Sequence, residues 1–225
     1  MNFHGKTKKI NSLVFGGTFD PIHYGHIEII KRINQKFNPE RFCIVPAGNP
    51  YMKLNKPLAT PIQRYEMCLI ALKYFSKLEF VDFEIHRSSP SYTYDTINFL
   101  NQKSSAPKID TIVVGMDSFK EINLWKKGNE LIKNYNFLVI KRPDTNFETS
   151  KFDNVILFDH ISDLSSTIIR KKIFSNKTID NDTPIEIVKY ITDNNLYKNG
   201  KWKEKRTLWQ GVDTEGISLW RLYFV

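Results

Sequence analysis

The residues best suited to chemistry gather in one stretch near the amino terminus, GGTFDPIHYGH, which runs from Gly16 to His26. Its two glycines allow a main chain to approach a bulky anion without interference from a Cβ atom. A helix predicted to begin at Tyr24 would add unpaired amide groups and the positive end of its dipole. His23 and His26 are three residues apart, so both imidazoles can lie on one helix face and donate hydrogen bonds to phosphate oxygens. The stretch therefore predicts a phosphate-binding site.

Other interpretations of this stretch fit less well. Two histidines at this spacing could be half of a metal site, but no cysteine, third histidine or suitably spaced acidic pair lies nearby to complete a zinc site. The glycine spacing differs from the GxGxxG fingerprint of dinucleotide-binding folds and from the GxxxxGKS/T phosphate loop. Neither a hydride-transfer enzyme nor a P-loop enzyme is indicated.

A second phosphate site is predicted far along the chain, in the stretch LSSTIIR. Ser165 and Ser166 stand before a helical pattern and are typical N-cap residues, so another helix N-terminus becomes available to a polyphosphate. Arg170 lies one turn along, on the same face as Ser166, and its rigid fork of donors can hold phosphate oxygens. Alone, this pattern is that of an ordinary capped amphipathic helix. Because the same chain holds a first phosphate site, we expect both helix starts to converge on one polyphosphate.

The elements that must position these residues alternate as β-α-β units, which predicts an α/β fold with a mostly parallel sheet and helices on both faces. Strands are expected at residues 12–15, 41–46, 78–85, 111–114, 137–141 and 155–158. Helices are expected at residues 24–37, 61–75, 94–102, 118–133, 167–174 and 184–194. Two of the helix starts have clear signals. Thr60 before Pro61 is an N-cap with proline at the first helical position, and Thr183 with Glu186 is a capping box.

Composition limits the class of protein. Of the 225 residues, 41% are hydrophobic and 25% are charged, a balance typical of a globular domain rather than a disordered or fibrous chain. The sequence contains no apolar run of about 20 residues, the length needed to span a bilayer, and no signal-peptide cleavage pattern follows the amino-terminal lysines. We therefore expect a cytoplasmic protein without a membrane partner. Cys43 and Cys68 fall in a predicted strand and a predicted helix, which favours buried thiols.

The motifs together resemble a known family. GGTFDPIHYGH matches the T/HxGH signature of the nucleotidyltransferase superfamily, and within it the chain resembles the bacterial nicotinate-nucleotide adenylyltransferases. Further similar motifs are RSSPSYT at 87–93, VGMDS at 114–118, Trp125, KRP at 141–143 and LSSTIIR at 164–170. The resemblance implies a Rossmann-like nucleotidyltransferase domain over residues 1–200. Residues 201–225 are left as a carboxyl-terminal extension of unknown role.

This resemblance implies adenylyl transfer from ATP, with Mg²⁺, to nicotinate mononucleotide, giving deamido-NAD and pyrophosphate in NAD biosynthesis. His23, His26 and Arg170 are implied to be catalytic: the histidines orient phosphates, and the arginine holds the β- and γ-phosphates. The implied ATP-binding residues are Gly16, Gly17, Thr18, Phe19, His23, His26, Gly115, Asp117, Ser165, Ser166, Thr167 and Arg170. The implied substrate-binding residues are Lys53, Tyr92, Thr93, Asp117, Trp125 and Arg142, with Trp125 stacked on the pyridine ring.

The chain departs from the family pattern in one loop. Where the family has PPHK or PPHR, this sequence reads NPYMK at 49–53, so Lys53 is kept and Met52 stands at the histidine position. For two residues the pattern alone allows a structural role as well: Asp117 as the N-cap of the next helix, and Trp125 as a core residue.

Other functions remain open from the sequence. A related enzyme could adenylylate nicotinamide mononucleotide or phosphopantetheine, or transfer a cytidylyl group, with the same phosphate site. The net charge of +9 also fits a nucleic-acid-binding module, but that hypothesis leaves both helix starts unexplained. We expect ATP and nicotinate mononucleotide as ligands and no nucleic-acid partner. Whether copies of the chain form a homo-oligomer is not determined by the sequence.

Overall fold

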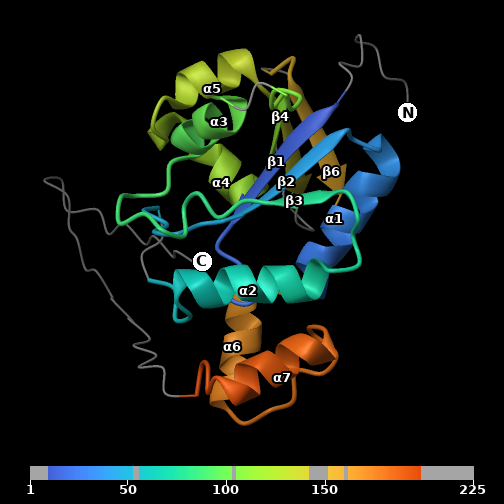
Figure 1. The fold of residues 1–225 in the computed structure, drawn as a ribbon, viewed down its shortest axis with the longest axis vertical. Helices are drawn as coiled ribbons and strands as arrows, with labels where there is room; N and C mark the ends of the chain where they lie inside the picture. Colours follow the sequence, from blue (N-terminus) through green and yellow to red (C-terminus); the bar gives the residue numbers. More distant parts are fainter. Residues whose placement is uncertain (1–9, 53–55, 103–104, 142–151, 160–161, 199–225) are drawn as a thin grey trace, which may run out of the picture.

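The fold is given by a computed structural model, which describes residues 10–52, 56–102, 105–141, 152–159 and 162–198. The strands of the described residues form one parallel sheet in the order β3-β2-β1-β4-β5-β6 (Figure 1). Their bounds are β1 Ser12–Gly17, β2 Arg41–Pro46, β3 Leu78–Phe80, β4 Thr111–Gly115, β5 Asn136–Lys141 and β6 Val155–Asp159. The prediction of a Rossmann-like parallel sheet is confirmed.

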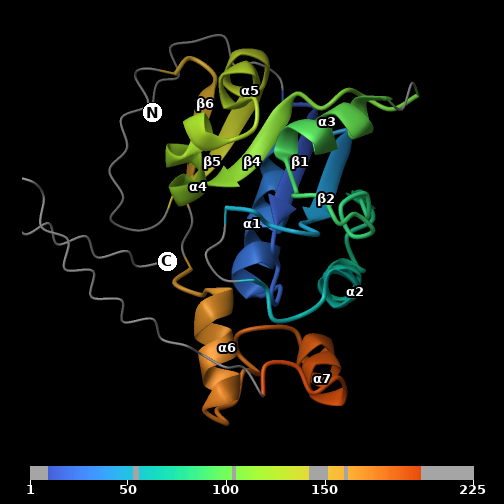
Figure 2. The same ribbon diagram turned by 90° about the vertical axis from the view of Figure 1, so that its left-hand side faces the viewer.

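Helices pack on both faces of this sheet, as predicted. Their bounds are α1 Tyr24–Phe37, α2 Pro61–Leu72, α3 Thr93–Gln102, α4 Met116–Lys120, the 3-10 helix η1 Ile122–Leu124, α5 Gly128–Asn134, α6 Ser166–Phe174 and α7 Ile185–Asp193. In both views α6 and α7 form the lower end of the molecule, past α2 (Figure 1, Figure 2).

The core has two layers because side chains of a strand alternate between its faces. Leu13 and Phe15 of β1 share one buried cluster with α1, α2, α6 and α7. Val14 of the same strand lies in the other cluster, with α3, α4 and α5. Cys43 and Cys68 are buried free thiols, one in each cluster, which confirms the prediction for both.

The strand order reverses between β1 and β4, which are neighbours in the sheet with Phe15 opposite Val113. The chain moves outward through β2 and β3 on one side of this pair, and through β5 and β6 on the other side. Open α/β sheets bind ligands at the carboxyl ends of the strands beside such a switch point. The connection after β1, which carries TFDPIH after the two glycines that end the strand, starts there.

Two predicted elements differ from the structure. The helix expected at 118–133 is divided into α4, η1 and α5, because Lys127 adopts φ 58 and the main chain at Gly128 lies against the Ile122 carbonyl group. A Cβ atom at Gly128 would lie 1.9 Å from that carbonyl oxygen. The strand expected at 78–85 ends at Phe80, since the chain turns at Asp82, whose carbonyl oxygen accepts from the Ile85 amide at 2.9 Å.

The start of α7 is not the predicted capping box. Its N-cap is Pro184, and the Thr183 side chain is buried and donates to the Ile22 carbonyl oxygen at 2.9 Å. Glu186 accepts a hydrogen bond from Lys73 instead of reaching back to the main chain of residue 183. A tertiary acceptor in the loop before α1 therefore replaces the local cap. By contrast, the N-cap predicted at Thr60 is confirmed, and Gln63 completes a capping box there.

The rest of the chain bears on two further expectations. No helix of the described residues is long and apolar enough to cross a bilayer. Residues 201–225 lie outside the described ranges, so the division into a domain and an extension stays a prediction.

Replacing Thr183 by valine should destabilise the fold, because the buried Ile22 carbonyl oxygen would lose its donor. We expect a loss of about 1–3 kcal/mol in the free energy of unfolding, measured by urea denaturation. Thr192→Val is the matched control, since the Thr192 hydroxyl donates to the Val188 carbonyl oxygen on the exposed side of α7. Equal effects of both changes would contradict the role given to Thr183.

Candidate active site

The loop after β1 is shaped by a buried aromatic ring. Phe19 adopts φ 50, and its ring, 2% exposed, packs edge-on against Phe15 and His26 with centroids 5.7 and 5.1 Å away. A Cβ atom at Gly17 would lie 2.7 Å from the Phe19 ring, whereas one at Gly16 would have only the Val45 carbonyl oxygen nearby, at 4.0 Å. Gly17 therefore makes room for Phe19, and Gly16 leaves the end of β1 open to an approaching group.

The two histidines lie side by side at the start of α1, as predicted. Their ring centroids are 3.8 Å apart with an interplanar angle of 32°. His23 is the N-cap residue, in extended conformation and 4% exposed, and its carbonyl oxygen accepts from the His26 amide at 2.9 Å. A pair of imidazoles at a helix N-terminus is suited to holding an anion, because both rings can donate hydrogen bonds in the field of the helix dipole.

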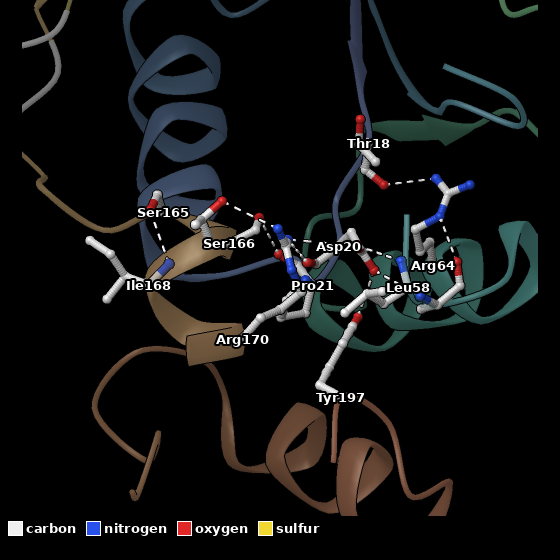
Figure 3. A network of polar contacts seen from close by, with 12 residues as sticks. Thr18, Asp20, Pro21, Leu58, Arg64, Ser165, Ser166, Ile168, Arg170 and Tyr197 are labelled. Atoms are coloured by element: carbon white, nitrogen blue, oxygen red, sulfur yellow. Dashed lines mark hydrogen bonds and ion pairs between the residues drawn. The ribbon is translucent and has the colours of Figure 1, made fainter. Parts of the chain in front are cut away.

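The second predicted helix start meets this loop (Figure 3). Ser165 is the N-cap of α6 and accepts from the Ile168 amide at 3.2 Å. Ser166 donates its hydroxyl to the Pro21 carbonyl oxygen at 2.9 Å, joining positions 145 residues apart in the sequence. The structure thus brings together the two helix starts that the sequence separates.

Arg170 binds the same loop. Its Nη1 donates to the Asp20 carbonyl oxygen at 2.6 Å and lies 3.6 Å from Asp20 Oδ2, while Nη2 donates to Thr167 Oγ1 at 3.2 Å. Its Nε is buried and has no hydrogen-bond partner among the described residues. The guanidinium is therefore anchored on one side beside the start of α1 and keeps donor capacity, since five N–H groups are available to it.

Asp20 is a buried carboxylate. It belongs to the GGTFDPIHYGH motif, but the sequence alone assigned it no role. It is 3% exposed and accepts from the Leu58 amide at 3.0 Å, the Ala59 amide at 3.1 Å and the Tyr197 hydroxyl at 2.9 Å. Burial and the charge of Asp20 raise the pKa of Tyr197, so that hydroxyl stays protonated and donates at neutral pH. Nothing in the local sequence around Tyr197 signals this contact.

Arg64 is a second buried charged residue at this site that the sequence motifs did not predict. Its side chain is fully buried and donates to the carbonyl oxygens of Thr18 at 2.8 Å, Gly48 at 3.1 Å and Ala59 at 3.3 Å. Burial lowers the pKa of Arg64, and the nearby charge of Asp20 partly restores it. Its position on the apolar face of α2, three and four residues before buried Met67 and Cys68, was a signal in the sequence that could have revealed it.

The end of β4 supplies the opposite side of the switch point. Gly115 is the exposed N-cap of α4, and a Cβ atom there would meet nothing within 4 Å. Asp117 is exposed in the first turn of α4. The alternative interpretation of Asp117 as the N-cap is therefore wrong, and its carboxylate stands near the carboxyl end of the sheet.

A group of aromatic residues lies at the start of α3. The rings of Tyr51 and Tyr92 are 4.6 Å apart, and Lys126 Nζ stands 4.9 Å from the centre of the Tyr92 ring while paired with Asp95 at 2.8 Å. Burial raises the pKa of Tyr51. The structure therefore brings the loop before residue 53 and the segment after η1 to the same place.

The other predicted substrate residues are placed as follows. Thr93 is the first residue of α3, and Trp125 is half-buried against the core cluster beneath α3 to α5. Met52, which stands at the family's histidine position and is not a predicted substrate residue, is exposed. Lys53 and Arg142 lie outside the described residues. Their roles stay predictions.

Comparison with known proteins identifies the family. Residues 14–172 match the cytidylyltransferase-like family. A Clostridium botulinum (strain Okra) protein named "Probable nicotinate-nucleotide adenylyltransferase" is 34% identical over 202 residues, which cover 84% of this chain and 100% of that protein. The chain belongs to the nicotinate-nucleotide adenylyltransferase family.

Two more relatives agree with this family. A Clostridium acetobutylicum protein of the same name is 34% identical over 196 residues, with 82% of this chain and 97% of that protein covered. A solved structure, "Plasmodium falciparum nicotinic acid mononucleotide adenylyltransferase complexed with NaAD", is similar with a TM-score of 0.70 and 25% identity, covering 84% of this chain and 98% of that chain. The family expected from the motifs is confirmed.

The two glycines of the loop should respond differently to alanine. Gly17→Ala should lower the free energy of unfolding by about 1–3 kcal/mol, because the buried Phe19 ring must move and with it the contact to His26. Gly16→Ala is the control and should change that free energy by no more than about 0.5 kcal/mol. Urea unfolding of both variants tests this, and an unfolding midpoint of Gly17→Ala equal to that of the parent would disprove it.

Proposed function

We propose that the chain transfers the adenylyl group of ATP to the phosphate of nicotinate mononucleotide and releases pyrophosphate. The observation that carries this proposal is the meeting of the α1 and α6 helix starts on one loop at the switch point of the sheet, in a member of the nicotinate-nucleotide adenylyltransferase family. The acid form of the acceptor is supported by the names of the relatives and by the neighbour complexed with NaAD.

The reaction needs positioning and charge compensation more than proton transfer. An oxygen of the acceptor phosphate forms a bond to the α-phosphorus of ATP, and the bond from that phosphorus to the bridging oxygen of the β-phosphate breaks. The attacking phosphate is already an anion near neutral pH, so no strong general base is required. The enzyme must hold two polyanions in line and offset their repulsion.

The residues at the two helix starts suit this task. His23 and His26 would orient the phosphates and stabilise the charge that develops at the α-phosphorus, with the main chain at Gly16 to Phe19 close by. Arg170 would hold the β- and γ-phosphates with its remaining donors, next to the start of α6 at Ser165, Ser166 and Thr167. Across the switch point, Gly115 leaves room for the nucleoside and Asp117 would accept hydrogen bonds from ribose hydroxyls.

The proposed reaction includes Mg²⁺, which would enter bound to the phosphates of ATP. The described residues contain no group of three or more His, Cys, Asp or Glu side chains that could hold a metal ion. Mg²⁺ keeps several waters and is commonly bound through substrate phosphates. On the ATP phosphates it would neutralise part of the charge of the leaving pyrophosphate.

The acceptor site would lie around the aromatic group at the start of α3. Tyr92 and Trp125 offer faces for the pyridine ring, and Thr93 offers a hydroxyl. Lys53 and Arg142 would bind the acceptor phosphate.

The acceptor is tested by pyrophosphate release. The protein is incubated with Mg-ATP and, in separate reactions, with nicotinate mononucleotide, nicotinamide mononucleotide and phosphopantetheine. We expect the highest kcat/KM with nicotinate mononucleotide. Equal release with all three acceptors, or release with none, would refute the proposed function.

The histidine role is tested by His26→Ala. Loss of a donor that stabilises developing charge commonly costs on the order of 10² to 10³ in turnover, and we expect kcat to fall by that amount. His86→Ala is the control, because His86 is an exposed histidine that lies 3.6 Å from Asp82 on the surface. If kcat of His26→Ala stayed within about threefold of the parent, the assignment would be wrong.

A further inference from the structure

We propose that Asp20 and Tyr197 are positioning residues for the ATP phosphate site: together they hold Arg170 and the loop between β1 and α1 in the arrangement that receives the polyphosphate. This inference rests on the proposed function, since it concerns the same ATP site. Neither residue would touch the reacting atoms.

The first support is the set of contacts at the Asp20 carboxylate. Oδ1 accepts from the Ala59 amide and the Tyr197 hydroxyl, and Oδ2 accepts from the Leu58 amide and stands 3.6 Å from Arg170 Nη1. These donors come from the segment before α2, from α6 and from the segment after α7 (Figure 3). The carboxylate therefore fixes the loop between β1 and α1 against three separate parts of the chain.

The second support is charge. Arg64 and Arg170 both lie at this loop. The charge of Asp20 acts on Arg64 more strongly than that of Glu84 does, and Asp20 also pairs with Arg170. A charge inside a protein is tolerated when it is paired and hydrogen-bonded. A correctly placed Asp20 is thus what allows a second guanidinium, Arg170, to remain beside the loop before any phosphate arrives.

The third support is the backbone that brings Tyr197 into contact. After α7 the chain adopts φ 51 at Asn195 and φ 66 at Tyr197. The left-handed region is common for asparagine at the end of a helix, but it is unfavourable for a bulky residue such as tyrosine. The Tyr197 side chain is 5% exposed, and its hydroxyl reaches Asp20 across 177 positions of sequence. Unfavourable backbone geometry is kept where the surrounding contacts enforce it.

The distinguishing variant is Tyr197→Phe, which keeps the ring and removes only the hydroxyl. We expect the Kd for a non-reactive ATP analogue, α,β-methylene ATP, to rise about 3- to 10-fold, the size of one ordinary hydrogen bond, because the lost hydroxyl acts on ATP only indirectly. The KM for nicotinate mononucleotide should stay within about twofold of the parent.

The matched control is Tyr190→Phe. The Tyr190 hydroxyl also donates to a carboxylate, that of Glu66, but on the exposed surface between α7 and α2. Its removal should leave the Kd for the ATP analogue unchanged. The melting temperature of each variant is measured as well, so that the binding assays are run on folded protein.

Asp20→Asn provides the second arm, since it keeps the shape of the side chain and removes its charge. We expect it to weaken binding of the ATP analogue more than Tyr197→Phe does, and we expect the double variant to be no weaker than Asp20→Asn alone because both act through one carboxylate.

The proposal is overturned if Tyr197→Phe binds the ATP analogue with the parent Kd, whatever happens to its melting temperature. That result would assign Tyr197 to folding alone, and it decides the matter even if Asp20→Asn does not fold. Because the assay measures ATP binding, it is independent of the acceptor. A parent chain that binds the analogue but adenylylates no pyridine nucleotide would refute the proposed function and leave this test intact.

Discussion

A carboxylate removed from water must be surrounded by donors, and that requirement organises the end of this molecule where the α1 and α6 helix starts meet. Asp20 is compensated by two amides before α2, by the hydroxyl of Tyr197 and by the charge of Arg170. Arg64 contributes the opposite charge. Its buried guanidinium donates to carbonyl oxygens of the loop between β1 and α1 and of the segment after β2. The loop between β1 and α1 is therefore held by polar contacts from four other segments of the chain.

This arrangement answers a problem set by the chemistry. A polyphosphate is well held by main-chain amides, imidazoles and guanidinium groups. When no anion is bound, however, the positively charged groups repel one another and the loops that carry the donors need other contacts to stay in place. The parallel sheet provides two fixed points at its switch, the ends of β1 and β4. The α1 and α6 starts are then joined to one loop through Ser166 and Arg170. Under the proposed function, this joining would reduce the reorganisation needed when ATP binds.

Packing imposes a second constraint on the same loop. The Phe19 ring fills the space beside Gly17 and contacts His26, so the position of a predicted catalytic histidine depends on a glycine two residues before that ring. Thr183 donates to Ile22 and the Asp182 carbonyl oxygen accepts from the Tyr24 amide, so the segment before α7 also fixes the start of α1. This segment does so although α7 bears none of the predicted ligands.

The sequence by itself determined the parallel α/β fold and the two helix starts at His23 and Ser165, because glycine, capping residues and periodic apolar residues act over a few neighbours. It also determined the family, because the motifs that carry the resemblance are short and contiguous. A local signal failed where a distant group competed with it, because the Thr183 hydroxyl donates to Ile22 instead of capping α7. The helix expected at 118–133 failed for a nearer reason, the close approach of Gly128 to the Ile122 carbonyl group. Only the tertiary structure revealed that Asp20, Arg64 and Tyr197 form one network, since hydrogen bonds between residues up to 177 positions apart leave no trace in local spacing. The residue types stated which chemistry is available, and burial decided which charged groups must hold one another in place.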